Sequence, residues 1–121
     1  MRILVIDDSR AIRGILRRML TEIGAEVAEA EHGGKALEVC AASAPFDLAL
    51  VDWNMPEVDG LTFVRTVRAN PRYAGMKLMM VTTETEVHQV ETALAAGANE
   101  YLMKPFGKDE VLGKLQLLGL G

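Results

Sequence analysis

Five side chains that can take part in chemistry stand directly after short apolar runs: Asp7 and Asp8, Asp52, Thr82, and Lys104. If the runs are parallel strands, their carboxyl ends share one edge of the sheet and bring these side chains together. Crowded carboxylates repel one another, and a hard divalent cation is the simplest compensation. Carboxylates with a backbone carbonyl and waters suit Mg²⁺, whereas the lack of His and Cys in these loops disfavours zinc or copper. The sequence therefore predicts a Mg²⁺ site.

The same residues predict phosphoryl-transfer chemistry. A carboxylate beside Mg²⁺ can attack phosphorus and form an aspartyl phosphate, a reaction that needs positioning and charge neutralisation more than acid–base groups. The acid on the central strand, Asp52, is the expected nucleophile, and Asp7 and Asp8 are the expected metal holders. The Lys104 ammonium and the Thr82 hydroxyl are suited to the non-bridging phosphoryl oxygens.

The elements that must position these residues alternate along the whole chain. The apolar runs occupy residues 3–6, 27–28, 48–51, 78–81 and 101–103, and helical patterns occupy 12–23, 33–44, 61–67, 87–94 and 111–118. Ser9 is the expected N-cap of the first helix and Gly24 its terminator. Continuous apolar runs are typical of parallel strands covered on both faces. Five βα units with right-handed crossovers predict an α/β fold, a flavodoxin-like doubly wound (βα)5 with strand order 2-1-3-4-5.

Length and composition set the class of protein. The 121 residues fit one domain spanning 1–121, with half the residues apolar, one cysteine (Cys40) and a net charge of −4. The acidic balance argues against binding to nucleic acid or to an anionic membrane. A lone cysteine forms no internal disulfide, and the chain has neither an apolar run of transmembrane length nor a signal-peptide layout. We therefore expect a cytoplasmic protein.

Four strings of residues carry a family resemblance: IDDS at 6–9, VDWNMP at 51–56 with DG at 59–60, VTTE at 81–84, and KPF at 104–106. Together they resemble the receiver domains of two-component response regulators, and most of all the single-domain chemotaxis receivers. The resemblance covers almost the whole chain.

The resemblance implies a role for each site residue. Asp52 would be the phosphoacceptor and, with Asp8, a direct Mg²⁺ ligand. Asp7 would act through water, and the backbone carbonyl of Asn54 would complete the protein ligands. Thr82 would be the switch hydroxyl and Lys104 the phosphate-pairing lysine. The bond between Lys104 and Pro105 would be cis.

The resemblance also implies partners and an output. The donor would be a sensor histidine kinase or a phosphotransfer protein, docking on the first helix. Phosphorylation would move Thr82, turn Tyr101 inward and change the face of the fourth helix, fifth strand and fifth helix. That face would include His88, Val90, Glu91, Leu94, Tyr101, Met103, Lys108, Val111 and Lys114. It would dock a downstream protein, with the flagellar motor as one candidate, from a monomer or a weak phosphorylation-dependent dimer.

Other interpretations stay open at this stage. A Mg²⁺-dependent phosphohydrolase of the haloacid-dehalogenase type needs Asp-x-Asp after a strand and a cap domain, and this chain offers neither. An FMN binder needs a phosphate loop rich in Ser, Thr and Gly, where two aspartates carry the wrong charge. Within the receiver family, the chain could be a phosphorelay intermediate or a receiver cut from a longer regulator. A receiver is a signalling domain that slowly dephosphorylates itself, not an enzyme acting on a separate substrate.

Overall fold

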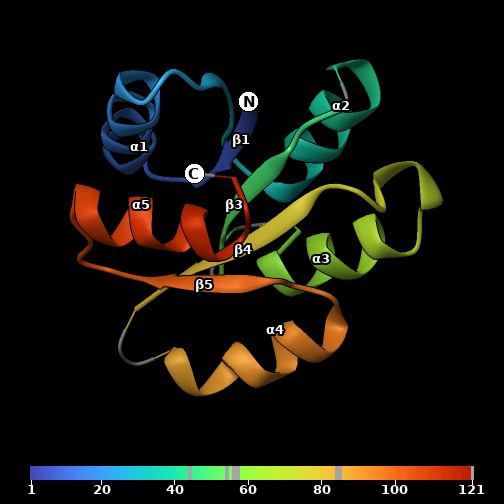
Figure 1. Cartoon of the computed structure of the whole chain (residues 1–121). Helices are drawn as coiled ribbons and strands as arrows, with labels where there is room; N and C mark the ends of the chain where they lie inside the picture. The colour runs from blue at the N-terminus through green and yellow to red at the C-terminus, as the bar shows by residue number, and fades with distance from the viewer. Residues whose placement is uncertain (44, 54, 56–57, 84–85, 121) are drawn as a thin grey trace.

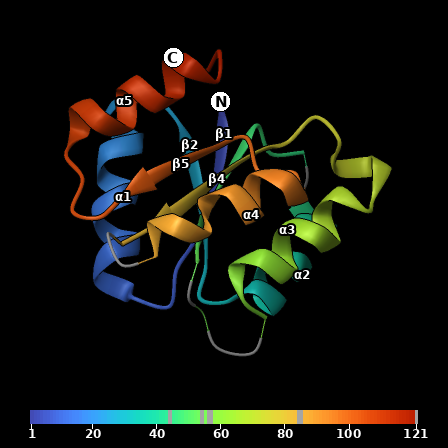
Figure 2. The same cartoon turned by 90° about the horizontal axis from the view of Figure 1, so that it is seen from below.

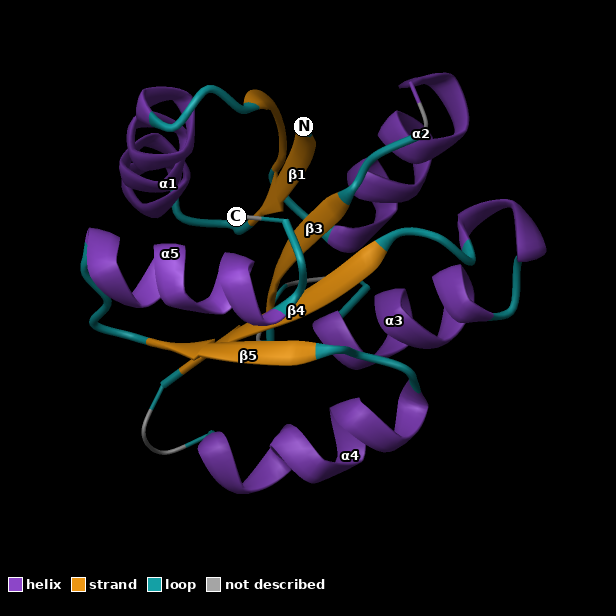
Figure 3. Cartoon of the chain, in the orientation of Figure 1, coloured by secondary structure: helices purple, strands orange, loops and turns teal. Residues whose placement is uncertain are grey.

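The computed structural model describes residues 1–43, 45–53, 55, 58–83 and 86–120. Within them, five strands alternate with five α-helices (Figures 1 and 3). The strands are β1 (Arg2–Ile6), β2 (Glu26–Ala30), β3 (Leu48–Asp52), β4 (Lys77–Thr82) and β5 (Glu100–Met103). The helices are α1 (Arg10–Glu22), α2 (Gly33–Ser43), α3 (Gly60–Arg68), α4 (Val90–Ala96) and α5 (Lys108–Leu117), with 3₁₀ turns η1 (Pro71–Tyr73) and η2 (Val87–Gln89). The predicted succession of elements is confirmed.

The strands form one parallel sheet in the order β2-β1-β3-β4-β5, as predicted. β3 lies at its centre and all five of its residues are buried, which explains its uninterrupted apolar run. β2 lies at an edge, where only its last residue is fully buried and glutamates at 26 and 29 alternate with small or apolar residues. That polar content is why only 27–28 were predictable as a strand.

The helices cover the two faces of the sheet unequally. α1 and α5 lie on one face, and α2, α3 and α4 lie on the other (Figures 1 and 2). Successive strand residues point to opposite faces, so Ile3 and Val5 pack with α1 and α5 while Leu4 and Ile6 pack with α2 and α3. Two buried clusters therefore hold the sheet rigidly, and with it the ends of its strands.

Main-chain hydrogen bonds extend the order of the sheet beyond the strand ends. The amide of Asp7 donates to the carbonyl of Ala30 at 3.1 Å, and the amide of Lys104 donates to the carbonyl of Thr82 at 2.7 Å. The first helix begins as predicted, because the Ser9 hydroxyl accepts from the amide of Ile12 at 3.2 Å. The residues that follow β1 and β5 are thus fixed by backbone contacts as well as by their side chains.

Arg68 joins four segments that the sequence leaves far apart. Its guanidinium donates to the carbonyls of Gly97 (2.8 Å), Tyr73 (3.2 Å) and Met76 (2.7 Å) and to the side-chain oxygen of Asn99 (2.9 Å). Gly97 ends α4 with φ +121°, and a Cβ there would collide with the Arg68 stem. α3, η1, the turn before β4 and the α4–β5 turn are therefore tied together by one side chain.

Gly60, the first residue of α3, lies against the end of β3. A Cβ on it would stand 2.5 Å from the carbonyl oxygen of Asp52. The close approach lets the chain fold back beside Asp52, where the Gly60 amide donates to the Trp53 carbonyl at 3.1 Å. A glycine is therefore required at this point for steric reasons.

Two glycine substitutions should change stability in opposite directions. Gly60→Ala should lower the free energy of unfolding by about 1–3 kcal/mol, because the added methyl overpacks against the backbone. Gly14→Ala, inside α1 with no atom within 4 Å of the new Cβ, should raise it by about 0.5–1 kcal/mol. Urea unfolding of both variants tests the pair, and equal effects would contradict the packing at residue 60.

Candidate functional site

Three carboxylates gather where β1 and β3 end. One oxygen each from Asp7, Asp8 and Asp52 lies within 4.8 Å of the others. Asp7 and Asp52 are buried, with exposed fractions of 1% and 5%, whereas Asp8 is exposed. The cluster is therefore anchored in the sheet and open to solvent on the side of Asp8.

Lys104 supplies a positive charge inside this cluster. Its Nζ lies 3.4 Å from Asp7 Oδ2 and 3.5 Å from Asp52 Oδ1. Burial by itself lowers the pKa of Lys104, but the charges of Asp52 and Asp7 outweigh burial and raise that pKa above its ordinary value. Lys104 is therefore a permanent cation, and one lysine faces three carboxylates.

The charge of Asp7 is only partly compensated by its neighbours. Burial raises its pKa, and this outweighs the opposing effects of the Ser9 amide, which donates to Oδ1 at 2.8 Å, and of Lys104. Its Oδ2 is buried and accepts no hydrogen bond from the described residues, although it faces the Lys104 ammonium at ion-pair distance. A buried carboxylate oxygen without a donor, in a set of three carboxylates, fits a hard divalent cation such as Mg²⁺.

Thr82 lies at the end of the neighbouring strand, β4. Asp52 pairs in register with Val81, so Thr82 stands one position beyond the partner of Asp52 on the same sheet edge. Its side chain is buried, and its hydroxyl donates to the Thr83 carbonyl at 3.1 Å, which is long for a hydroxyl hydrogen bond. A stronger acceptor nearby can therefore compete for this hydroxyl.

Comparisons with known proteins agree with this geometry. Residues 3–116 match the response regulator receiver domain family. A chemotaxis protein CheY homolog of Campylobacter jejuni is 43% identical over 100% of this chain and 95% of its own length. Chemotaxis protein CheY1 of Helicobacter pylori is also 43% identical, over 98% of this chain and 96% of its own. The solved structure of Vibrio cholerae chemotaxis protein CheY4 superimposes with a TM-score of 0.89 at 36% identity, covering 97% of both chains.

The chain belongs to the response regulator receiver family. This membership supports the receiver interpretation over the phosphohydrolase and FMN-binding alternatives, and the receiver fold of the relatives is the doubly wound sheet described above. Among the described residues of this receiver, no helix is both long and apolar enough to cross a bilayer.

The structure brings together most of the residues predicted for the receiver site. Asp7, Asp8, Asp52 and Lys104 form one cluster, with Thr82 beside it on the same sheet edge. The peptide bond between Lys104 and Pro105 is cis, as the resemblance implied. Asn54, predicted to offer its backbone carbonyl, lies outside the described residues.

Tyr101, predicted as the switch aromatic, is half-buried on β5. The Nζ of Lys114 lies 4.2 Å from the centre of its ring and also donates to Glu100 Oε1 at 2.9 Å. Lys114, from α5, therefore covers an aromatic ring while it pairs with a carboxylate of the same strand.

The predicted docking face needs a correction at two positions. Val111 (1% exposed) and Val90 (9% exposed) lie in the hydrophobic core, because both are on the buried side of their helices, Val111 with Leu115 and Val90 with Ala93. Leu94 and Met103 are exposed apolar residues, at 42% and 38%. His88, Glu91 and Lys108 are exposed, and Lys108 pairs with Glu22 of α1 at 3.0 Å. The exposed apolar part of the face is therefore Leu94 and Met103, with Tyr101 and Lys114 beside them.

Sequence reasoning missed the role of one arginine. The guanidinium of Arg13 donates to the main-chain carbonyl of Asp7 at 2.6 Å and to Glu29 at 3.1 Å. The available signal was its place beside Ile12 and Leu16, at the border of the buried face of α1. Arg13 therefore contacts the backbone of the acidic cluster.

Replacing Asp7 should stabilise the metal-free protein. Because burial raises the pKa of Asp7 in the folded state, ionisation of Asp7 lowers the free energy of unfolding. This loss of stability is absent below the ordinary pKa of 3.8. It grows as the pH rises toward the raised pKa of the folded state. Asp7→Asn should therefore raise the unfolding temperature at pH 7 in EDTA, with a gain that shrinks as pH falls toward 4. Asp8→Asn, at an exposed carboxylate, should change the unfolding temperature less. A destabilised Asp7→Asn protein at pH 7 would contradict the burial argument.

Proposed function

We propose that this receiver accepts a phosphoryl group on Asp52 from a sensor histidine kinase, a phosphotransfer protein or a small phosphodonor. The observation that carries the proposal is the cluster of three carboxylates within 4.8 Å, two of them paired with one half-buried lysine. A cluster this rich in carboxylates is suited to phosphoryl transfer, a reaction in which a bound metal ion neutralises the negative charge.

The transfer step uses Asp52 as the nucleophile. One carboxylate oxygen of Asp52 attacks the donor phosphorus and forms a P–O bond, while the bond from phosphorus to the donor's nitrogen or oxygen breaks. The leaving group keeps the electron pair of that bond. Lys104, at 3.5 Å from Asp52, then faces the new phosphoryl oxygens as a permanent cation.

Asp7, Asp8 and Asp52 are the side chains that would hold Mg²⁺, together with the main-chain carbonyl of Asn54. Bound there, the ion supplies charge neutralisation for the carboxylates and the phosphoryl oxygens. Water later attacks the phosphorus and releases inorganic phosphate, so the phosphorylated state reverses itself slowly. In our proposal this self-dephosphorylation is the receiver's own turnover, with no other substrate.

In this proposal, Thr82 and Tyr101 transmit the structural effect of phosphorylation to the surface. The new phosphoryl oxygens are stronger acceptors than the Thr83 carbonyl, so the Thr82 hydroxyl turns to them. The chain after β4 follows, and Tyr101 moves further inward on the adjacent strand. The change alters the surface around Leu94, Met103 and Lys114, where a downstream protein docks.

Two partners follow from this scheme. An apolar pocket beside the site is lined by Ile12 and Ile15 of α1 and by Lys104, Pro105 and Phe106, and it suits a helical phosphodonor domain that must bring its phosphate to Asp52. Because the relatives are named chemotaxis proteins, a flagellar motor component is the downstream partner we propose. We place the receiver in the cytoplasm as one domain spanning 1–121, monomeric or weakly dimeric when phosphorylated.

A substitution at Asp52 tests the acceptor. The protein incubated with Mg²⁺ and acetyl phosphate should gain one phosphoryl group, measured by intact-mass spectrometry, and EDTA should prevent the gain. Asp52→Asn should abolish it because the amide is a poor nucleophile. Asp59→Asn is the matched control: this side chain caps α3 through the Thr62 amide, and asparagine caps equally well. Phosphorylation that survives Asp52→Asn would overturn the assignment.

A second test follows the switch. With both tyrosines replaced by fluorotyrosine, the ¹⁹F signal of Tyr101 should shift on activation with beryllofluoride, while that of Tyr73, buried beside α3, should stay constant. Thr82→Ala should still bind beryllofluoride and lose most of the Tyr101 shift, because no hydroxyl couples the site to β5. An unchanged Tyr101 shift in Thr82→Ala would contradict this route.

A further inference from the structure

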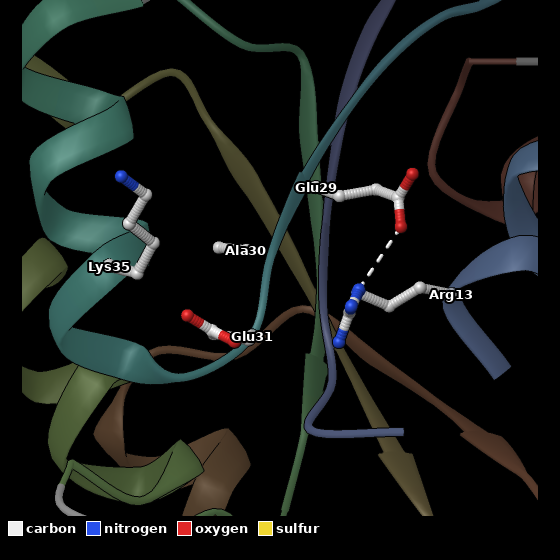
Figure 4. Close-up of a pocket in the computed structure, with 5 residues that line it drawn as sticks. All are labelled: Arg13, Glu29, Ala30, Glu31 and Lys35. Atoms are coloured by element: carbon white, nitrogen blue, oxygen red, sulfur yellow. Dashed lines mark hydrogen bonds and ion pairs between the residues drawn. The ribbon is translucent and has the colours of Figure 1, made fainter. Parts of the chain in front are cut away.

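Arg13 connects the acidic cluster to the edge of the sheet. One arm of its guanidinium, Nη1, donates to the main-chain carbonyl of Asp7 at 2.6 Å, and Nε donates to Glu29 Oε1 on β2 at 3.1 Å. Figure 4 shows Glu29 reaching from β2 toward Arg13 of α1, on the opposite side of the strand from Lys35. The Arg13 side chain is only 15% exposed. The Arg13 side chain therefore links α1, β1 and β2 through hydrogen bonds that are largely shielded from solvent.

Glu29 is itself held from both sides. Its second carboxylate oxygen pairs with Arg17 Nε at 2.5 Å, one turn further along α1. Burial tends to raise the pKa of Glu29, but the hydrogen bonds and charges of Arg17 and Arg13 outweigh burial and lower it. Glu29 therefore stays ionised and fixes the Arg13 guanidinium in place.

The carbonyl that Arg13 binds belongs to the peptide bond between Asp7 and Asp8. The Asp7 side chain has anchors of its own in the Ser9 amide and Lys104. The Asp8 side chain is exposed and makes no hydrogen bond or ion pair with the part of the chain that the structure describes. The direction in which the Asp8 carboxylate leaves the turn thus depends on the orientation of the Asp7–Asp8 peptide.

We propose that Arg13 is a positioning residue: held by Glu29, it fixes the Asp7–Asp8 peptide and thereby presents the Asp8 carboxylate for Mg²⁺. The inference rests on the proposed function of the same site. Arginine is needed because its planar fork reaches the carbonyl and the carboxylate with two separate nitrogens, which a lysine ammonium on a single stem does less well. Partners of metal ligands that fix ligand geometry commonly change metal affinity by about tenfold or more when removed.

The effect of charge alone has the opposite sign. A guanidinium next to three carboxylates repels a divalent cation, so removing it would strengthen Mg²⁺ binding if Arg13 acted only through its charge. A positioning role predicts weaker binding after the same substitution. The sign of the change in Mg²⁺ affinity therefore separates the two roles.

The test is calorimetric titration of the unphosphorylated full chain with Mg²⁺. Arg13→Met, which keeps much of the aliphatic stem, should raise the dissociation constant for Mg²⁺ by about tenfold. Arg13→Lys, which keeps the charge, should raise this constant by a smaller factor. Arg17→Met is the matched control, since it removes a cation from the same Glu29 without touching Asp7, and it should change the constant by less than about twofold. Unfolding in EDTA checks that each variant is folded.

Three results would overturn the inference. The first is Mg²⁺ binding by Arg13→Met that is unchanged or tighter than in the parent protein. The second is an equal loss of Mg²⁺ affinity in Arg17→Met and Arg13→Met. If Arg13→Met fails to fold, the third is Mg²⁺ binding by Arg13→Lys that is unchanged from the parent protein. A parent protein that binds no Mg²⁺ at millimolar concentration would instead contradict the proposed function, and the inference with it. A parent that binds Mg²⁺, with Arg13 variants that bind it equally well, would contradict only the inference.

Discussion

Three carboxylates are forced within 4.8 Å of one another at the end of a parallel sheet, and two of them are buried. Like charges at this separation repel strongly, and burial makes the repulsion harder to screen. Lys104 relieves part of this repulsion through Asp7 and Asp52, yet burial still raises the pKa of Asp7. The site is therefore incomplete without further positive charge, which a bound metal ion would supply.

The rest of the fold fixes the positions of these carboxylates. Two apolar clusters, one on each face, fix β1 and β3, whose ends carry the acids. Backbone hydrogen bonds continue past the strand ends, and Gly60 allows α3 to start directly against the Asp52 carbonyl. The free energy gained from burying the sheet offsets the electrostatic cost at its edge, so the stability of the core maintains a destabilised functional site.

The order of strands and helices and the acidic site were predictable because they depend on local patterns and on one topological rule. Apolar runs marked the buried strands, Ser9 marked a cap, and the rule for parallel sheets placed Asp7, Asp8 and Asp52 at one edge. Only part of the edge strand β2 was predictable, because glutamates at 26 and 29 interrupt its apolar residues. The burial of Val111 and the contacts of Arg13 were not predictable, because the direction of a side chain at the border of a helix face depends on tertiary packing. Val111 turns into the core, and Arg13 reaches across to Asp7 and Glu29.

In our proposal, the buried acid at the end of β3, Asp52, forms the covalent bond to phosphorus. Borohydride reduces an acyl phosphate to an alcohol, so treatment of the protein phosphorylated with Mg²⁺ and acetyl phosphate converts the acceptor aspartate to homoserine. Peptide mass spectrometry then identifies its position. We predict homoserine at residue 52, and no homoserine when EDTA is present. Homoserine at residue 7 or 8, or at no aspartate of the cluster, would contradict it.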